Sequence, residues 1–204
     1  MDLKAHWERM YRSLAPTELS WHQDRPRLSL ELIQGTGVGK MAPIIDVGGG
    51  TSTLVDELLV EGYQHVTVLD VAATALEHAR QRLGARDAAV TWMEADITTV
   101  ELAPDGYEVW HDRAVFHFFT RPEERRRYVE TMRRSVKRGG YVILATFSLE
   151  GPTRCSGLDV VRYSPATLAH QFGAEFEVVK SVREVHWTPL GVEQAFQYST
   201  FLKC

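Results

Sequence analysis

The chain has 204 residues, and 44% of them are hydrophobic, so we expect one core-forming domain with an appended segment. A formal net charge of -4 gives no reason to expect a nucleic acid or an anionic membrane as partner. Cys155 and Cys204 lie far apart without metal-ligand spacing, so neither a disulfide framework nor a zinc site is predicted. The first residues lack signal-peptide character, and no segment approaches the length of a membrane span. We therefore expect a cytoplasmic protein.

The first 40 residues differ from the rest of the chain. Aromatic and leucine side chains recur between residues 3 and 33 before any clear strand, which predicts an ordered helical lead over residues 1–40, ahead of a main domain at 41–204. Residues 35–39, Gly-Thr-Gly-Val-Gly, form a flexible break between the two. Trp7, Tyr11, Trp21 and His22 either fold over a ligand as a lid or simply pack as the apolar face of a helix.

Strands and helices then alternate along the chain. Strands are predicted at 41–45, 66–69, 90–93, 107–110 and 141–147, with helices after 54, at 72–83, and from a capping box at 120–123 to about 136, closed by Gly139 and Gly140. Strands at 176–187 and 194–202, separated by six residues, predict a hairpin. The pattern predicts an α/β three-layer sandwich, in which a parallel sheet ends in an antiparallel pair.

The segment DVGGGTS, from Asp46 to Ser52, joins the first predicted strand to its helix. Glycines at such a turn allow positive φ angles and let a ligand approach the backbone. A dinucleotide fingerprint would place a third glycine where Thr53 stands, so the fit to a nicotinamide cofactor is imperfect. Asp46, Asp70 and Asp96 all fall at the C-terminal ends of strands, where open α/β sheets bind ligands. Each of these acids alone is more often a cap or loop carboxylate.

These residues resemble the class I, seven-stranded methyltransferases that use S-adenosylmethionine, over roughly residues 44–202. The resemblance implies a Rossmann-like fold with a mostly parallel seven-stranded sheet whose last strand is antiparallel. It also implies that Asp70 binds the ribose, that Asp96 contacts the adenine, and that no metal is needed. The implied cofactor-binding residues are Asp46, Gly48, Gly49, Gly50, Thr51, Ser52, Asp70, Val71, Asp96, Ile97 and His111, with Trp7, Tyr11 and Trp21 from the lead.

The end of the fourth predicted strand should border the transferred methyl group in such a protein. Asp112 is the candidate proton acceptor or hydrogen-bond partner of the acceptor, His117 faces the same cleft if a short helix begins at Arg113, and Arg113 is positioned to hold an anionic group. The alternative is that Asp112 and Arg113 form a structural pair and that His117 is a core histidine. Cys155, in a glycine-bearing loop on the substrate side, is more often a buried inert thiol than a contact to substrate.

The methyl acceptor is not determined by the sequence. The glycine turn and the N-terminal aromatic pattern resemble lysine methyltransferases that act on citrate synthase or elongation factors, whereas the segment from Asp112 to His117 is closer to small bacterial methyltransferases. The acceptor is therefore a small molecule or a protein lysine. Alternatives are a non-catalytic S-adenosylmethionine-binding or scaffolding module and, third, a nicotinamide enzyme. The arginine-rich segment 125–138 is interleaved with glutamates and predicts a solvated helix face rather than a nucleic-acid site.

Overall fold

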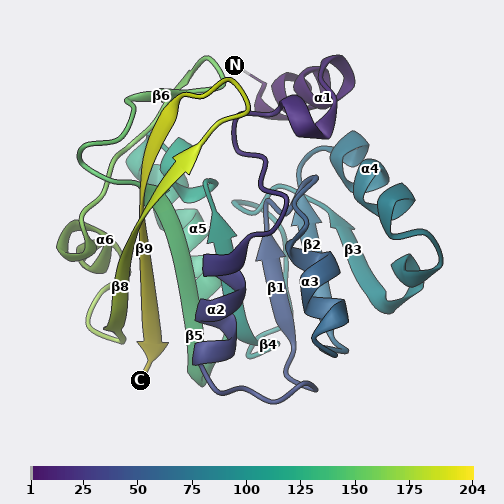
Figure 1. The fold of residues 1–204 in the computed structure, drawn as a ribbon. Coiled ribbons are helices and arrows are strands. Elements are labelled where there is room, and N and C mark those ends of the chain that lie inside the picture. The colour runs from purple at the N-terminus through teal and green to yellow at the C-terminus, as the bar shows by residue number, and fades with distance from the viewer. Residues whose placement is uncertain (1) are drawn as a thin grey trace.

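The computed structural model describes residues 2–204, which form one seven-stranded sheet with helices on both faces (Figure 1). In chain order, the helices are α1 (Leu3–Ser13), α2 (Arg27–Gly35), α3 (Leu54–Val60), α4 (Ala73–Leu83), α5 (Pro122–Ser135) and α6 (Pro165–Phe172). The sheet strands are β1 (Ile44–Val47), β2 (Val66–Asp70), β3 (Val90–Glu94), β4 (Tyr107–Arg113), β5 (Val136–Phe147), β8 (Phe176–Trp187) and β9 (Glu193–Lys203). Short 3₁₀ turns lie at Pro16–Glu18, Gly84–Ala89 and Phe116–Phe118.

The sheet has the strand order β3-β2-β1-β4-β5-β9-β8. Strands β1 to β5 pair in parallel, and β9 runs antiparallel to both of its neighbours, β5 and β8. The predicted fold class, the parallel run and the closing hairpin are therefore confirmed. A second, two-stranded ribbon of β6 (Arg154–Cys155) and β7 (Leu158–Asp159) lies between β5 and α6, where no strand was predicted.

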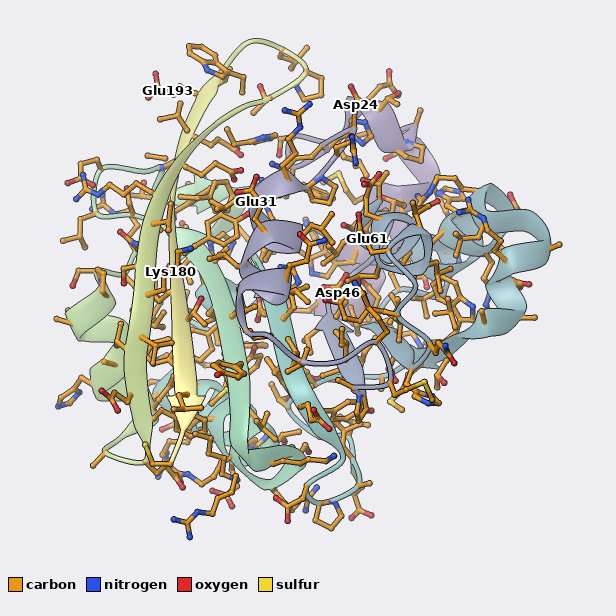
Figure 2. All side chains as sticks on the ribbon, turned by 60° about the horizontal axis from the view of Figure 1, so that its bottom comes forward. Asp24, Glu31, Asp46, Glu61, Lys180 and Glu193 are labelled. Atoms are coloured by element: carbon orange, nitrogen blue, oxygen red, sulfur yellow. The ribbon has the colours of Figure 1, made fainter. Side chains whose placement is uncertain are left out.

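Two apolar layers hold the helices against the sheet. One face packs against α2, α3 and α4, and Leu30, Leu32 and Ile33 of α2 belong to this core. The opposite face packs against α5 and α6 around Trp110, Tyr128 and other rings. Figure 2 shows the side chains that fill both layers. The apolar stripe of the lead segment is thus part of the core of the sheet.

Several predicted boundaries differ from the structure; the first strand, predicted at 41–45, spans Ile44–Val47. Strand β4 continues to Arg113, three residues beyond the predicted end, because it stays paired with both β1 and β5. Helix α5 begins at Pro122 without a side-chain cap, so the capping box at Thr120 is wrong. The same helix ends at Ser135, next to the predicted end at about Val136, but Gly139 and Gly140 lie inside β5, which begins at Val136 rather than at Tyr141 because Val136 already pairs with Tyr107 in the sheet.

Among residues 2–204, no helix is long and apolar enough to cross a membrane.

Candidate active site

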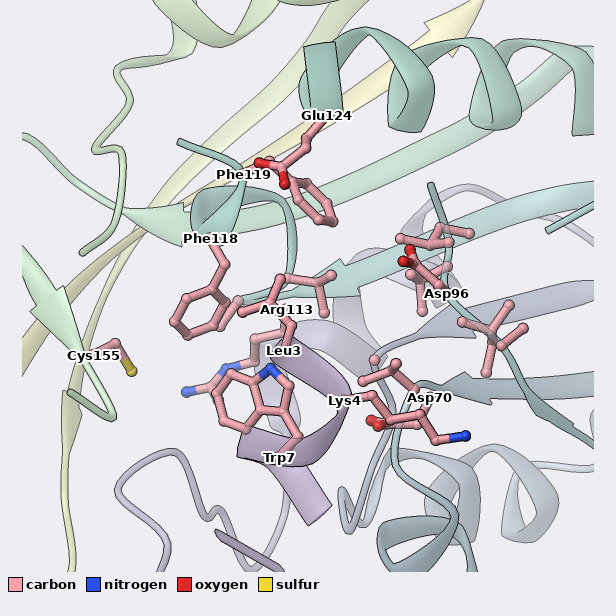
Figure 3. Close-up of a pocket in the computed structure, with 18 of the residues that line it drawn as sticks. Leu3, Lys4, Trp7, Asp70, Asp96, Arg113, Phe118, Phe119, Glu124 and Cys155 are labelled. Atoms are coloured by element: carbon pink, nitrogen blue, oxygen red, sulfur yellow. The ribbon is translucent and has the colours of Figure 1, made fainter. Parts of the chain in front are cut away.

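A cavity of about 430 Å³ lies at the C-terminal ends of β1, β2, β3 and β4, beneath α1. Figure 3 shows Asp70 and Asp96 on one side of it and Cys155 on the other, with Trp7, Arg113 and Phe118 between them. Ligands of open parallel sheets bind at this edge because the loops after the strands diverge there. Of the predicted site residues, the cavity is lined by Trp7, Tyr11, Trp21, Gly48, Asp70, Val71, Asp96, Ile97 and Arg113.

The glycine turn brings the backbone close to neighbouring side chains of the cavity. Gly48 and Gly50 have φ angles of 65° and 50°, which only glycine adopts without strain. A Cβ on Gly48 would lie 2.0 Å from Cγ2 of Val115, and one on Gly50 would lie 2.5 Å from the Tyr11 hydroxyl oxygen. A side chain at either position would therefore displace the walls of the cavity.

Asp70 ends β2 at the floor of the cavity and is only 5% exposed. Its Oδ1 accepts the backbone N–H of Ala72 at 2.8 Å, and its Oδ2 lies 3.1 Å from where a Cβ on Gly50 would stand. Loss of hydration on burial raises the pKa of Asp70 to about 7, although the Ala72 N–H acts in the opposite direction. The carboxylate therefore lacks hydrogen-bond donors that a ligand with hydroxyl groups would supply.

Asp96 follows β3 and is exposed at the same cavity. Its Oδ1 accepts hydrogen bonds from the backbone N–H and the hydroxyl of Thr98, both at 2.8 Å. This turn fixes the carboxylate on one side while Ile97 and Val71 line the wall beside it. The arrangement suits an aromatic ring that carries a hydrogen-bond donor at its edge.

Thr51 and Ser52 do not line the large cavity. Their backbone carbonyls accept hydrogen bonds from the Arg82 guanidinium at 2.8 and 2.7 Å, and the Ser52 hydroxyl accepts the N–H of Leu54 at 3.2 Å. They line a separate cavity of about 40 Å³, together with Gly49, Asp46 and His111. The Ser52 hydroxyl caps the start of α3, and neither residue lines the large cavity.

His111 was predicted at the cofactor, but it is buried between two polar partners. Strands β1 and β4 place it directly beside Asp46, and its Nδ1 lies 2.7 Å from Asp46 Oδ1. Its Nε2 lies 2.9 Å from the hydroxyl of Ser29 on α2. His111 does not line the large cavity. Its contacts with Asp46 and Ser29 instead connect β1, the strand before the glycine turn, to α2.

Asp112, the predicted proton acceptor, points to the opposite face of the sheet, so this prediction is wrong. Successive residues of a strand alternate between faces, and β4 extends through this position. The Asp112 carboxylate is fully buried and accepts hydrogen bonds from the N–H groups of Val115 and Phe116 and from the Tyr128 hydroxyl, at 2.8, 3.1 and 2.6 Å. It does not line the large cavity and holds the turn after β4 against α5.

His117 is also outside the large cavity, which contradicts its predicted catalytic place. The short helix begins at Phe116 rather than Arg113, and it packs the fully buried imidazole against Phe118 and Phe147. The Phe147 N–H donates weakly to Nδ1 at 3.4 Å, and Nε2 has no hydrogen-bond partner among residues 2–204. Burial, aided by the charge of Arg113, lowers the pKa of His117 to about 3. The side chain is a neutral core histidine.

Arg113 crosses between β4 and the final hairpin. Its Nε donates to the Tyr198 hydroxyl and its Nη1 to the Trp21 carbonyl, both at 3.0 Å. Its Nη2 lies 3.8 Å from Oε2 of Glu184. The guanidinium does not pair with Asp112, because the two side chains leave opposite faces of the sheet. This end of the cavity also holds Cys155, whose pKa is raised by burial.

Helix α1 lies over the cavity and is attached to α4. Trp7 contacts Phe118 and Trp21 edge to face, with ring centroids 5.1 and 5.7 Å apart. Tyr11 is 5% exposed, and its pKa is raised well above 10 by burial. The predicted position of these aromatic residues beside the cavity agrees with the structure, while their action as a moving lid stays a prediction.

Several cavity residues were not predicted from the sequence. Lys4 comes from the lead, Gln194 and Phe196 come from β9, and Phe118 and Phe119 come from the turn after β4. Phe118 and Phe119 follow the predicted end of the strand closely, so this apolar pair was the one feature of the sequence that could have placed them at the cavity. The β9 residues reach the site only because the hairpin pairs with β5.

Comparison with known proteins agrees with this geometry. Residues 44–140 match the family described as "Methyltransferase domain". A solved structure of Burkholderia thailandensis 1,6-didemethyltoxoflavin-N1-methyltransferase with bound S-adenosylhomocysteine superimposes with a TM-score of 0.75 at 18% identity, covering 98% of this chain and 87% of that one. Residues 44–140 thus match a methyltransferase domain, and the fold of the chain is the Rossmann-like fold of class I methyltransferases.

Two curated methyltransferases are similar to parts of this chain. The malonyl-[acyl-carrier protein] O-methyltransferase of Anoxybacillus flavithermus is 37% identical over 83 residues, which is 40% of this chain and 30% of that protein. The eEF1A lysine and N-terminal methyltransferase of Danio rerio is 24% identical over 119 residues, which is 58% of this chain and 17% of that protein. The chain thus spans less than a third of the length of either relative.

The cofactor of class I methyltransferases is S-adenosylmethionine, and the cavity residues fit it. Asp70 offers a buried carboxylate short of donors, as two vicinal ribose hydroxyls require. Gly48 and Gly50 leave a cradle that a Cβ would fill. Asp96 offers an acceptor for an exocyclic amine beside the apolar wall of Ile97. These residues would hold the adenosine half of the cofactor.

Proposed function

We propose that this methyltransferase moves the methyl group of S-adenosylmethionine to a small-molecule acceptor bound at the Cys155 end of its cavity. One observation carries the proposal: a single cavity joins the Asp70 and Asp96 edge of the sheet to an end walled by Arg113, Cys155 and aromatic rings. When bound, the cofactor supplies an electrophilic methyl group on a sulfonium.

The residues of the chain have separable roles in this proposal. Asp70 accepts hydrogen bonds from the ribose, and Asp96 orients the adenine. Trp7, Phe118 and Trp21 exclude water, which favours a displacement that disperses charge. Arg113 orients the acceptor. Holding the acceptor in line with the methyl group supplies most of the rate increase, because positioning replaces a bimolecular encounter.

A small acceptor is favoured over a protein lysine by the walls of this end. Five separate segments of the chain form the walls of the Cys155 end: α1, the segment that follows α1, the turn after β4, β6 and β9. A lysine would also place its ammonium beside the Arg113 guanidinium, and like charges disfavour each other at close range.

The test uses S-adenosylmethionine carrying a labelled methyl group, the enzyme, and a cell lysate split into small molecules and proteins. We expect label in the small-molecule fraction and strong loss of it with Asp70→Asn. Label in a discrete protein band would instead assign a protein acceptor. Saturable binding of S-adenosylhomocysteine without label in either fraction would favour a non-catalytic binding module.

Because Cys155 and Cys204 are both free thiols, we propose the cytoplasm as the compartment.

A further inference from the structure

The side-chain amide of Gln194 lines the large cavity without a hydrogen-bond partner. Gln194 lies near the start of β9 and is 7% exposed. Gln197, further along β9, donates its amide to the carbonyls of Val182 and Tyr198 at 3.1 and 2.8 Å, whereas the Gln194 amide bonds to no residue between 2 and 204. Unlike Nη2 of Arg113, this amide keeps an accessible surface in the cavity. A largely buried amide without partners is unfavourable, so a ligand that supplies its hydrogen bonds is stabilised.

The register of the final hairpin sets the position of this amide. Alternate residues of a strand share a face, so Gln194 lies on the same face of β9 as Phe196, which also lines the cavity. On the neighbouring strand, β8, its partner is His186, whose Nε2 is 2.8 Å from the carbonyl oxygen of Ser20. The imidazole is therefore engaged elsewhere. The hairpin holds the amide on the side of Phe196, and the described part of the chain does not satisfy it.

The width of the sheet separates Gln194 from the adenosine half of the cofactor. Asp70 ends β2 and Asp96 follows β3, and both fit the adenosine. In the strand order, β9 is four places from β2. Neighbouring strands lie about 4.8 Å apart, so about 19 Å separates these two strands. The glycine turn follows β1, which is still three places from β9. The Gln194 amide therefore faces the part of the cavity that the acceptor occupies.

The charged groups of this end are already paired within the protein. Arg113 uses Nε and Nη1 for hydrogen bonds to its neighbours, and its Nη2 is buried 3.8 Å from Glu184. Lys4, on α1, pairs with Glu94. Burial raises the pKa of the Cys155 thiol, which stays protonated. A charged acceptor would therefore be buried here without a counter-ion, which is costly, so this end favours a neutral molecule.

The walls around the amide are flat and aromatic. The Arg113 guanidinium lies 4.5 Å from the centroid of the Phe196 ring, so Arg113 acts on a ligand by holding this ring in place. Across the cavity, Trp7 packs edge to face against Phe118 and Trp21. Aromatic walls of this kind stack against a planar ring better than against a flexible chain.

A primary amide presents an acceptor oxygen and a donor nitrogen side by side in one plane. It is complementary to a group that presents a donor and an acceptor in the same way, and glutamine pairs with the edge of adenine by this geometry. A lactam, in which an N–H adjoins a C=O, is such a group and carries no charge. A planar ring with a lactam edge therefore fits both the amide of Gln194 and the aromatic walls.

We infer that the acceptor is a neutral, planar heteroaromatic molecule whose lactam edge pairs with the side-chain amide of Gln194, an inference that rests on the proposed function. The lactam N–H donates to Oε1 of Gln194, and Nε2 of Gln194 donates to the lactam C=O. Gln194 thus selects the acceptor and orients its ring. The atom that receives the methyl group lies on the edge of the ring away from Gln194, toward the glycine turn.

The experiment compares four ligands on the enzyme saturated with S-adenosylhomocysteine, with affinity measured by calorimetry. Carbostyril is a planar bicyclic lactam, coumarin has an oxygen in place of its N–H, valerolactam keeps the lactam edge without an aromatic ring, and naphthoate is planar and charged. We expect carbostyril to bind at least about tenfold more tightly than coumarin, which leaves Oε1 of Gln194 without a donor. Valerolactam and naphthoate should also bind at least about tenfold more weakly, because one lacks the aromatic surface and the other buries an unpaired charge.

A pair of glutamine variants tests the assigned contact. Gln194→Met keeps the length of the side chain and removes both hydrogen-bonding groups, so it should weaken carbostyril by about tenfold and leave coumarin nearly unchanged. Gln34→Met makes the same change at an exposed site on α2 and should keep the preference for carbostyril. Binding of S-adenosylhomocysteine shows that each variant is folded. If Gln194→Met does not fold, the comparison of the four ligands on the wild type still decides.

The outcomes separate this inference from the proposed function. Equal affinity for carbostyril and coumarin, tighter binding of valerolactam or naphthoate, or no binding of carbostyril would overturn the lactam assignment and leave methyl transfer to a small molecule standing. A preference for carbostyril that persists in Gln194→Met would overturn the contact with Gln194. Failure of the wild type to bind S-adenosylhomocysteine would overturn the proposed function and this inference with it.

Discussion

The carboxylate of Glu8 accepts the backbone N–H of Ala73 at 2.7 Å, so the N-terminal helix caps the helix that follows β2. The other Glu8 oxygen accepts the Thr74 hydroxyl at 2.5 Å, and α4 has no side-chain cap of its own. These hydrogen bonds lower the pKa of Glu8, because they favour its charged form. One side chain thus ties α1, with Trp7 and Tyr11, to the element beside Asp70.

Loss of this contact should weaken cofactor binding. We expect Glu8→Ala to reduce the affinity for S-adenosylhomocysteine about tenfold, because two hydrogen bonds to a charged group no longer hold α1 closed. Calorimetric titration measures the change. Glu31→Ala, an exposed site on α2, is the control and should bind like the wild type. Equal affinity of Glu8→Ala and the wild type would show that α1 contributes nothing to the cofactor site.

Asp70 should make cofactor binding depend on pH. Its pKa is about 7 in the free protein, and hydrogen bonds from the ribose favour the charged carboxylate and lower that pKa in the complex. Binding then releases a proton below pH 7, so affinity is constant above that pH and falls by up to about tenfold for each unit below it. Titrations between pH 6 and 8 measure this, and Asp70→Asn should lose the dependence. A flat wild-type profile would exclude the ribose contact.

Asp112 should matter for stability and not for the cofactor. Asp112→Ala leaves the N–H groups of Val115 and Phe116 and the buried Tyr128 hydroxyl without their acceptor, which should lower the free energy of unfolding by about 3 kcal/mol. The folded variant should bind S-adenosylhomocysteine within about threefold of the wild type, since the carboxylate faces α5. Asp24→Ala, at a fully exposed site, is the control for stability. Lost cofactor affinity at unchanged stability would reverse this assignment.

His117 should destabilise the fold in acid. The pKa of His117 is about 3 in the folded protein, whereas an unperturbed histidine, as in the unfolded chain, has a pKa of 6.5. Below pH 6.5 the unfolded chain therefore binds a proton that the folded chain excludes. Between pH 6.5 and 5.5 the wild type should lose roughly 1 kcal/mol more than His117→Phe does. Urea unfolding at the two pH values gives the difference. The control is His170→Gln, on an exposed face of α6, which should lose as much stability as the wild type. Equal losses of stability in the wild type and His117→Phe would contradict a buried neutral imidazole.

The sequence predicted most of the sheet because its evidence is local. The runs 66–69, 90–93 and 141–147 are short and apolar, and the glycines at 48–50 follow the first strand directly. Asp70, Asp96, Val71 and Ile97 then reach the cavity because parallel strands end at one edge. For these four residues, their spacing along the chain was enough to predict their position at the cavity.

The failures lie where a neighbouring element decides the outcome. The pairing of β4 with β1 and β5 extends it past Trp110, and this extension turns Asp112 away from His111 and Arg113. The Asp46, His111 and Ser29 contacts join three elements that no short motif connects. Gln194 and Phe196 depend likewise on the register of the final hairpin. A single sequence contains no direct record of such pairings.

The first measurement we would make is calorimetric titration of the wild type and Asp70→Asn with S-adenosylhomocysteine and, separately, with NADH. Saturable binding of one S-adenosylhomocysteine per chain is expected, with affinity at least about tenfold lower in Asp70→Asn, because the ribose loses a charged acceptor. NADH should not bind. Saturable binding of NADH and none of S-adenosylhomocysteine would contradict the assignment of the cavity.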